Sequence, residues 1–382
     1  MTWKGSVEAQ REAFLQEFTQ AGSNRRAVCR AWGVSAKTAY KWLARSGVES
    51  ETGLRDQSRR PLRSPGRTSG AVEQRIVEVR REHPAWGGRK IAALLEREGV
   101  PGVPHPSTIT GVLRRAGLLG EVRTQPRKVE RFERSRPNEL WQADFKGHFA
   151  VGDGTRCHPL LVLDDHSRYC VGAWACPDEQ GTTVERAFQA IFQQYGLPES
   201  MLMDNGAPWG RDPRQGHTRL ELWLIRLGIG VLHGRPRHPQ TQGKLERLNR
   251  TLGEEVLAGA GVVASCAAMQ QMLDPWRIVY NEVRPHEALS MQVPASRYQA
   301  SERRMPEKLP PIEYEEGDPV RRVQKGGWIS YGGREYRLSK GLEGSPVAIR
   351  RGEADAELAV YFCSARIALL DERTGQTRPL RK

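Results

Sequence analysis

The chain has 382 residues, which is long enough for two or three domains of roughly 150 residues each. Hydrophobic residues make up 38% and charged residues 27% of the chain, a composition that excludes collagen-like and wholly disordered proteins. No run approaches the roughly 18 apolar residues of a membrane span, and the first residues lack a signal-peptide core. We therefore expect a cytoplasmic protein with no membrane partner.

Basic residues are concentrated in the first third of the chain. The whole sequence has a net charge of +14. Residues 1–137 contain 27 Lys and Arg against 14 Asp and Glu, whereas residues 138–300 contain 16 against 18. This distribution indicates a polyanion-binding N-terminal region and a middle domain whose function needs carboxylates. A solubilising charge excess is the alternative, but such an excess usually spreads more evenly.

The cysteine and histidine spacings match no common zinc or disulfide motif. The six cysteines form no C-x-x-C pair, and the nine histidines form no H-x-x-x-H pair. We expect reduced, mostly buried thiols and no zinc-binding N-terminal domain.

Residues 1–50 are predicted to form a helix-turn-helix. Gly33 suits the positive φ of the turn, Ser35 is a plausible N-cap, and Ala39 begins an apolar stripe on the second helix. The polar faces of that helix suit the major groove of DNA, although a plain helical hairpin with a solvated charged face is the alternative. The candidate DNA contacts on it are Lys37, Thr38, Lys41 and Arg45.

A second helix-turn-helix is predicted over residues 71–125, after a basic linker at 51–70 whose Arg59 and Arg60 could track phosphates. Ser107 is a plausible cap for its last helix, and Ile109, Val112 and Leu113 supply the apolar face of that helix. Two such units could together span an extended DNA site. The candidate contacts in this second unit are Arg89, Lys90, Thr108, Arg114 and Arg115.

From residue 138 the pattern changes from helical to mixed, after a second linker at 126–137. Strands are expected at 140–149, 159–163, 168–176, 201–203 and 228–233, and helices at about 182–194, 220–227 and 241–259. A further helix is expected between about 271 and 281. Residues 138–300 are therefore predicted to form an α/β domain with a mixed sheet. Short strands with Gly turns predict a small all-β barrel at 312–382.

Three carboxylates of the middle domain have unusual settings. Asp144 lies inside an apolar strand, where an acid is disfavoured, and Asp204 ends a later strand. Glu246 lies on a helix, about 100° away from its leucine stripe. Each residue alone has a structural explanation, as a turn, cap or solvated-face residue. Together they suit a pair of hard divalent cations that act on a phosphodiester.

Five sequence blocks resemble the DDE superfamily of transposases and retroviral-type integrases, and bacterial insertion-sequence transposases in particular. The blocks are Trp141–Asp144, Leu163–Arg168, Met203–Gly206, His238–Arg247 and Tyr280–Leu289. The resemblance also covers the paired helix-turn-helix units, and so nearly the whole chain.

The resemblance implies an RNase H-like core in which Asp144, Asp204 and Glu246 bind two Mg²⁺ or Mn²⁺ ions. It further implies nicking at the transposon end and attack of the freed 3′-hydroxyl on target DNA. The implied partner is double-stranded DNA, both element ends and target, bound by a homo-oligomer associated with the nucleoid. Asp164 and Asp165 are rival carboxylates, although their Asp-His-Ser-Arg run suggests a turn.

Two departures from the family pattern affect this assignment. Forty-one residues separate Asp204 from Glu246, which suggests a long loop between 206 and 218. Position 253, where retroviral relatives place a basic residue, is Gly, so Arg250 is the best substitute for a phosphate contact, with Lys244 as a further candidate. A domesticated DNA-binding regulator without catalytic activity and an RNase H-like nuclease remain the alternative functions.

Overall fold

A computed structural model describes residues 6–48, 54–56, 66–119, 133–210, 216–234 and 243–379. The chain divides into two compact units, Met1–Arg67 and Thr68–Lys382. Arg59, Arg60 and the His238–Gln242 part of the sequence motif lie outside the described residues, as do parts of both predicted linkers. The finer domain boundaries at 71–125, 138–300 and 312–382 stay predictions.

The first unit is built from α1 (Val7–Thr19), α2 (Arg25–Trp32) and α3 (Ala36–Val48). Gly33 ends α2 with a φ of 66°, and the Ser35 hydroxyl accepts the backbone N–H of Thr38, so both predicted turn residues are confirmed. The core centres on Phe14, Phe18 and Ala39, all at most 1% exposed. The predicted helix-turn-helix therefore comprises α2 and α3, with α1 packed across them.

The second unit begins with α4 (Gly70–Glu82), α5 (Gly88–Arg97) and α6 (Pro106–Arg115). Ile109, Val112 and Leu113 are buried as predicted. The cap of α6 differs from the prediction: the His105 side chain accepts the backbone N–H of Ser107, and Pro106 occupies the first turn. Proline lacks an N–H and has a helical φ, so it favours a helix start one residue before Ser107.

The central sheet is mixed. Its strands are β1 (Trp141–Phe145), β2 (Phe149–Ala150), β3 (Arg156–Asp164), β4 (Cys170–Cys176), β5 (Ser200–Met203) and β6 (Gly230–His233). The strand order is β2-β3-β1-β5-β6, and β4 also pairs with β3. The first strands pair antiparallel, whereas β1, β5 and β6 run parallel. The predicted strand 140–149 is divided in two, because residues 146–148 interrupt it.

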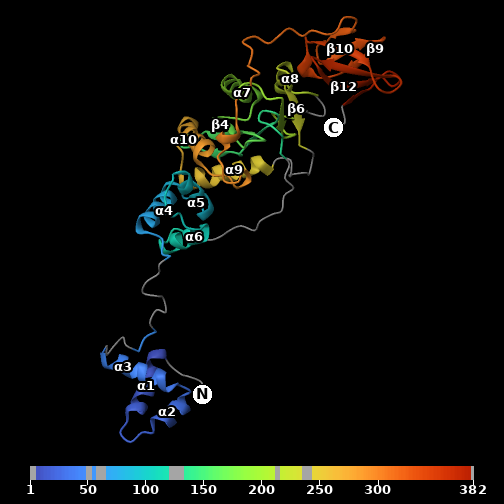
Figure 1. Cartoon of the computed structure of the whole chain (residues 1–382). Helices are drawn as coiled ribbons and strands as arrows, with labels where there is room; N and C mark the ends of the chain where they lie inside the picture. Colours follow the sequence, from blue (N-terminus) through green and yellow to red (C-terminus); the bar gives the residue numbers. More distant parts are fainter. Residues whose placement is uncertain are drawn as a thin grey trace. The chain divides into compact units, whose positions relative to one another are not determined.

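Helices cover both faces of this sheet (Figure 1). α7 (Gly181–Tyr195) and α8 (Arg219–Arg226) pack on one face through residues such as Phe188 and Leu224. α9 (Gly243–Glu255) and α10 (Cys266–Ile278) pack on the other through residues such as Leu248 and Leu273. α9 ends four residues earlier than predicted and is followed by a short 3₁₀ turn, Leu257–Gly259.

The C-terminal region is all-β, as predicted. β7 (Val320–Arg322), β10 (Pro346–Arg351), β11 (Glu357–Phe362), β12 (Ala365–Asp371) and β13 (Thr377–Pro379) form a five-stranded sheet. β8 (Trp328–Tyr331) and β9 (Arg334–Arg337) form a hairpin. Closure of these strands into a barrel stays a prediction. In the described part of the chain, no helix has the length and apolar character needed to cross a membrane.

Candidate active site

Asp144 lies in β1, and Asp204 immediately follows the neighbouring parallel strand β5. β1 pairs with β5 so that Trp141 faces Met201 and Gln142 faces Leu202. The same offset, continued by two residues, aligns Asp144 with Asp204. Asp144 is half-buried within β1, whereas Asp204 is exposed immediately after β5. The sheet therefore brings together two carboxylates that are far apart in sequence.

Glu246 approaches Asp144 from α9. Leu245, Leu248 and Leu252 are buried against the sheet, which leaves Glu246 exposed at the side of the helix. Asp144 and Glu246 line one hollow of about 600 Å³. The other lining residues are Phe145, Lys146, Asn249, Arg250, Gly253 and Glu254. The structure thus brings two of the three predicted carboxylates to one surface hollow and the third to the adjacent strand end.

The electrostatics of this site favour a bound cation. Burial, reinforced by the negative charge of Asp204, raises the pKa of Asp144 to about 6. The amide of Asn249 opposes this shift by donating to Asp144 Oδ2 over 3.3 Å. Carboxylate oxygens are the ligands that Mg²⁺ and Mn²⁺ prefer, and a cation would relieve the repulsion between the two aspartates. The donor set therefore fits the divalent ions that the sequence predicts.

Asp164 and Asp165 have structural roles in the turn that follows β3. Asp164 is completely buried and accepts the hydroxyl and backbone N–H of Ser167. Asp165 is also completely buried and accepts the side-chain amide of Gln142 at 2.7 Å. Lys244 Nζ lies 2.5 Å from Asp165 Oδ1. Lys244, a predicted DNA contact, therefore turns toward the sheet and anchors the first turn of α9.

The predicted contacts on α3 lie where DNA could reach them. Lys37 and Lys41 are exposed, whereas Thr38 and Arg45 are partly buried. The Thr38 hydroxyl is paired with that of Ser35 at 2.8 Å. The described part of the first unit thus presents two lysines from the helix that was predicted to enter a groove.

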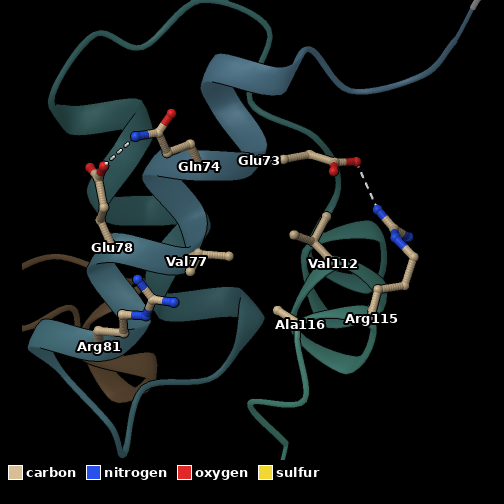
Figure 2. Close-up of a pocket in the computed structure, with 8 residues that line it drawn as sticks. All are labelled: Glu73, Gln74, Val77, Glu78, Arg81, Val112, Arg115 and Ala116. Atoms are coloured by element: carbon tan, nitrogen blue, oxygen red, sulfur yellow. Dashed lines mark hydrogen bonds and ion pairs between the residues drawn. The ribbon is translucent and has the colours of Figure 1, made fainter.

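The predicted contacts on α6 are exposed but not equivalent. Thr108, Arg114 and Arg115 are all on the surface. Figure 2 shows Arg115 reaching from α6 toward Glu73 on α4, and the two side chains form an ion pair of 2.7 Å. They border a hollow of about 470 Å³, whose lining also includes Gln74, Val77, Glu78, Arg81, Val112 and Ala116. Arg115 is therefore partly neutralised, and Arg114 is the freer surface arginine of the two.

The predicted contacts on α5 face the central α/β domain. Arg89 lies 3.4 Å from Glu287, and the Lys90 ammonium is close to Arg284 and Glu255. Burial, together with the positive charge of Arg284, lowers the pKa of Lys90 to about 8. The structure thus favours a packing role for Lys90, and its contact with DNA stays a prediction.

Glu255, at the end of α9, joins the α4–α6 module to the core. Its carboxylate accepts the indole N–H of Trp86 at 3.2 Å and that of Trp276 at 3.0 Å. The guanidinium of Arg284 donates to it at 2.8 Å. Arg97 adds a hydrogen bond to the backbone carbonyl of Val283. The Glu255 carboxylate therefore accepts hydrogen bonds from the loop before α5, from α10 and from the segment that follows α10.

Asn249 and Lys146 line the hollow but were not identified from the sequence. Asn249 stands three residues after Glu246, a spacing that places two residues on one helical face, so its position was a usable signal. Lys146 follows β1, and no sequence pattern distinguishes it from other surface lysines. Arg250, the predicted phosphate contact, lines the same hollow and is exposed.

Sequence-family models match consecutive parts of the chain. A homeodomain-like domain matches residues 38–113, and two integrase core domain models match residues 134–239 and 227–294. The C-terminal domain of IS481 family transposases matches residues 318–378. Together, these family matches and the relatives described below support a DDE-type insertion-sequence transposase. The residues that form the mixed sheet lie within the integrase core matches, which indicate a polynucleotidyl transferase.

Several individual proteins are similar to this chain. An uncharacterized 31.7 kDa protein of insertion element IS407 from Burkholderia multivorans is 28% identical over 60% of this chain and 82% of its own length. An uncharacterized 39.2 kDa protein of IS476 from Xanthomonas euvesicatoria is 25% identical over 63% of this chain and 67% of its own. The HTLV-2 integrase catalytic core domain, solved in complex with magnesium, covers 43% of this chain and 99% of its own at 16% identity, with a TM-score of 0.33.

Proposed function

We propose that this transposase cuts the phosphodiester at the ends of its element and joins the freed 3′-hydroxyl to target DNA, with Asp144, Asp204 and Glu246 as catalytic carboxylates. The observation that carries the proposal is the alignment of Asp144 with Asp204 on neighbouring strands, with Glu246 lining the hollow at Asp144. These three side chains would hold two Mg²⁺ or Mn²⁺ ions. When bound, two such ions activate an attacking oxygen and stabilise a leaving oxygen.

The side chains around the triad have distinct proposed tasks. Asn249 and the backbone N–H of Phe145 both donate to the carboxylate of Asp144, and these two hydrogen bonds would orient it for a ligand. Arg250 and Lys146 line the same hollow and would offset the negative charge of a DNA phosphate there. The ion pair between Lys244 and Asp165 holds the start of α9, and with it Glu246, against the sheet.

The helical modules are proposed to hold the element ends. α3 presents Lys37 and Lys41, and α6 presents Thr108 and Arg114, so each module offers an exposed helix with phosphate-binding or base-reading groups. The homeodomain-like match at residues 38–113 supports this assignment. Because two ends must be joined in one reaction, we infer that the transposase acts as a homo-oligomer on DNA.

A strand-transfer assay tests the proposal. The full chain is incubated with labelled oligonucleotides that carry the inverted repeats flanking its gene, with a target plasmid and with Mg²⁺ or Mn²⁺. We expect joined product from the wild type and at least a thousandfold less from Asp144→Asn, Asp204→Asn or Glu246→Gln. Glu185→Gln, on α7 and outside the site, serves as the matched control and should retain activity.

The same assay separates the alternatives. No joined product from a folded wild type, or equal product from Asp144→Asn, would refute the transposase proposal. Binding of the ends without any cleavage would favour a DNA-binding regulator. Cleavage of an RNA–DNA hybrid without strand transfer would favour a nuclease.

A further inference from the structure

Two imidazoles and a carboxylate meet on the central sheet, outside the carboxylate triad. His148, His158 and Glu179 each offer one ligand atom, and these atoms lie within 4.8 Å of one another. His148 lies between β1 and β2, His158 lies in β3, and Glu179 lies between β4 and α7. We propose that these three residues bind a divalent transition-metal ion of the Zn²⁺ class. The proposal does not depend on the proposed function.

Strand register brings the two imidazoles together. Phe149 of β2 faces Cys157 of β3, and the same register places His148 opposite His158. Residues directly opposite each other on antiparallel strands have Cβ atoms about 5 Å apart. The two imidazole ring centroids are 5.0 Å apart, with an angle of 34° between the rings. The pair is therefore set by the backbone of the sheet.

A one-residue shift between β1 and β2 creates this pairing. Phe145 of β1 faces Leu160, a register that would place residue 147 opposite His158. The interruption at 146–148 changes the register before β2 begins. Gly147 has a φ of 90° there, a conformation that glycine adopts at little cost. This local geometry directs His148 toward His158.

Glu179 reaches the same point from the other side of β3. His158 faces Cys176, the last residue of β4, and Glu179 follows three residues later. Glu179 Oε1 lies 2.8 Å from His158 Nδ1. The neighbouring Asp178 instead accepts the backbone N–H of Gln180. Glu179 is therefore the acid that completes the set.

The donor set indicates the class of ion. Two imidazoles and one carboxylate form a ligand set that Zn²⁺ uses in proteins, with a water in the fourth position. Mg²⁺ prefers oxygen ligands alone, so it would favour the triad instead. Ligand atoms around a tetrahedral ion with bonds of about 2.1 Å lie roughly 3.4 Å apart. The ligand atoms, which all lie within 4.8 Å of one another, would therefore approach each other by at most about 1.4 Å, and the exposed His148 side chain has room to rotate.

The competing explanation for this cluster is an ion pair between His158 and Glu179 alone, in which His148 takes no part. That ion pair does not explain why the His148 ring lies beside the His158 ring, whereas a shared metal ion would bind both imidazoles. A bound ion would connect the segment after Asp144 with the segment before α7. It would therefore tie the end of the catalytic strand to the neighbouring helix.

Cobalt titration of the full chain tests this proposal. The Asp144→Asn, Asp204→Asn, Glu246→Gln triple variant removes the triad carboxylates as competing ligands. Co²⁺ is added and its visible d–d absorption is followed, after which Zn²⁺ is added as a competitor. We expect one Co²⁺ per chain, displaced by Zn²⁺. Adding His148→Ala should weaken the affinity at least tenfold, and Glu179→Gln should do the same.

His105→Ala is the matched control, because His105 is an exposed histidine outside the cluster. It should leave Co²⁺ affinity unchanged. His148 is exposed, so its removal should leave the circular dichroism and melting temperature as they are, and a loss of binding then reports the site itself. Absence of the absorption bands, or equal affinity in the His148→Ala and His105→Ala variants, would overturn the proposal.

Discussion

The Lys244 ammonium lies 2.5 Å from Oδ1 of Asp165, and that carboxylate is completely buried. Asp165 also accepts the side-chain amide of Gln142 and the backbone N–H of Arg134. Lys244 stands two residues before Glu246 on α9. The ion pair therefore fixes the turn of α9 that carries a proposed catalytic carboxylate.

Lys244→Met should lower both stability and the Mn²⁺ affinity of the triad. Removing one partner of a buried ion pair leaves the other charge uncompensated, and we expect a loss of about 2–3 kcal/mol of unfolding free energy. Urea denaturation measures the stability, and calorimetric titration with Mn²⁺ measures the affinity. Lys308→Met, at an exposed position, is the control. Equal effects of the two substitutions would contradict an anchoring role for Lys244.

Glu255→Gln should loosen the α4–α6 module from the core. The substitution removes the negative charge that accepts hydrogen bonds from Arg284 and from two indole N–H groups. It also places the NH₂ group of the new glutamine against one of these donors, where it cannot form a hydrogen bond. We expect faster amide hydrogen exchange across residues 70–115 and a loss of about 2–4 kcal/mol of unfolding free energy. The neighbouring Glu254 is exposed, so Glu254→Gln should leave both the hydrogen exchange and the free energy of unfolding close to their wild-type values. Unchanged exchange in Glu255→Gln would refute the junction.

Glu221 in α8 predicts a specific dependence of stability on pH. His217 Nδ1 lies 2.8 Å and His233 Nε2 lies 3.7 Å from its Oε1. Burial opposes ionisation of this carboxyl, but hydrogen bonds and charge from the two histidines overcome that effect and lower the pKa of Glu221 to about 2. The carboxyl therefore binds its proton more tightly in the unfolded chain than in the folded one.

The stabilisation from Glu221 should be complete above about pH 4.5 and should be lost as pH falls toward 2. It corresponds to about 3 kcal/mol. Urea denaturation of the wild type and Glu221→Gln between pH 3 and pH 7 should show a stability difference that narrows as the solution becomes more acidic. Glu302→Gln, at an exposed position, should track the wild type. A difference that stays constant with pH would contradict this interpretation.

Lys41 and Lys90 were both expected to contact DNA, and the structure distinguishes them. Lys41 is exposed on α3, whereas the Lys90 ammonium lies among charged groups of the core. Lys41→Ala should reduce the slope of log affinity against log salt concentration by about 1, the value for one phosphate contact. Lys90→Met should leave that slope unchanged, and because burial and Arg284 disfavour the charged ammonium of Lys90, the substitution should not lower the melting temperature. Fluorescence anisotropy with end DNA at several salt concentrations measures the slope, with Lys308→Ala as the control.

The sequence was sufficient to predict the central sheet because burial, strand propensity and turn residues agree along each strand. Asp144 is identifiable because an acid is unfavourable within an apolar strand. Asp204 is identifiable because the turn residues Asn205 and Gly206 follow it directly at the end of a strand. Helical periodicity likewise places Glu246 beside the leucine stripe. Each of these features depends on residues that are close together in the sequence, so one sequence is enough to identify it.

Contacts between modules could not be predicted in this way. Periodicity places Lys90 and Lys244 on polar helix faces, but it does not reveal that Glu255 and Asp165 lie against those faces. The pairing of His148 with His158 was hidden for a related reason. It depends on a register shift at Gly147, whereas the common zinc motifs have their ligands at short, fixed sequence spacings.

α9 connects two different tasks of the protein through one rigid element. Glu246 lies near its start and Glu255 at its end, nine residues apart, which corresponds to about 13 Å along a helix axis. The first residue belongs to the proposed catalytic site, and the second holds the α4–α6 module. Under the proposed function, a helix of fixed length would therefore set the distance between the DNA sequence bound by that module and the bond that is cut.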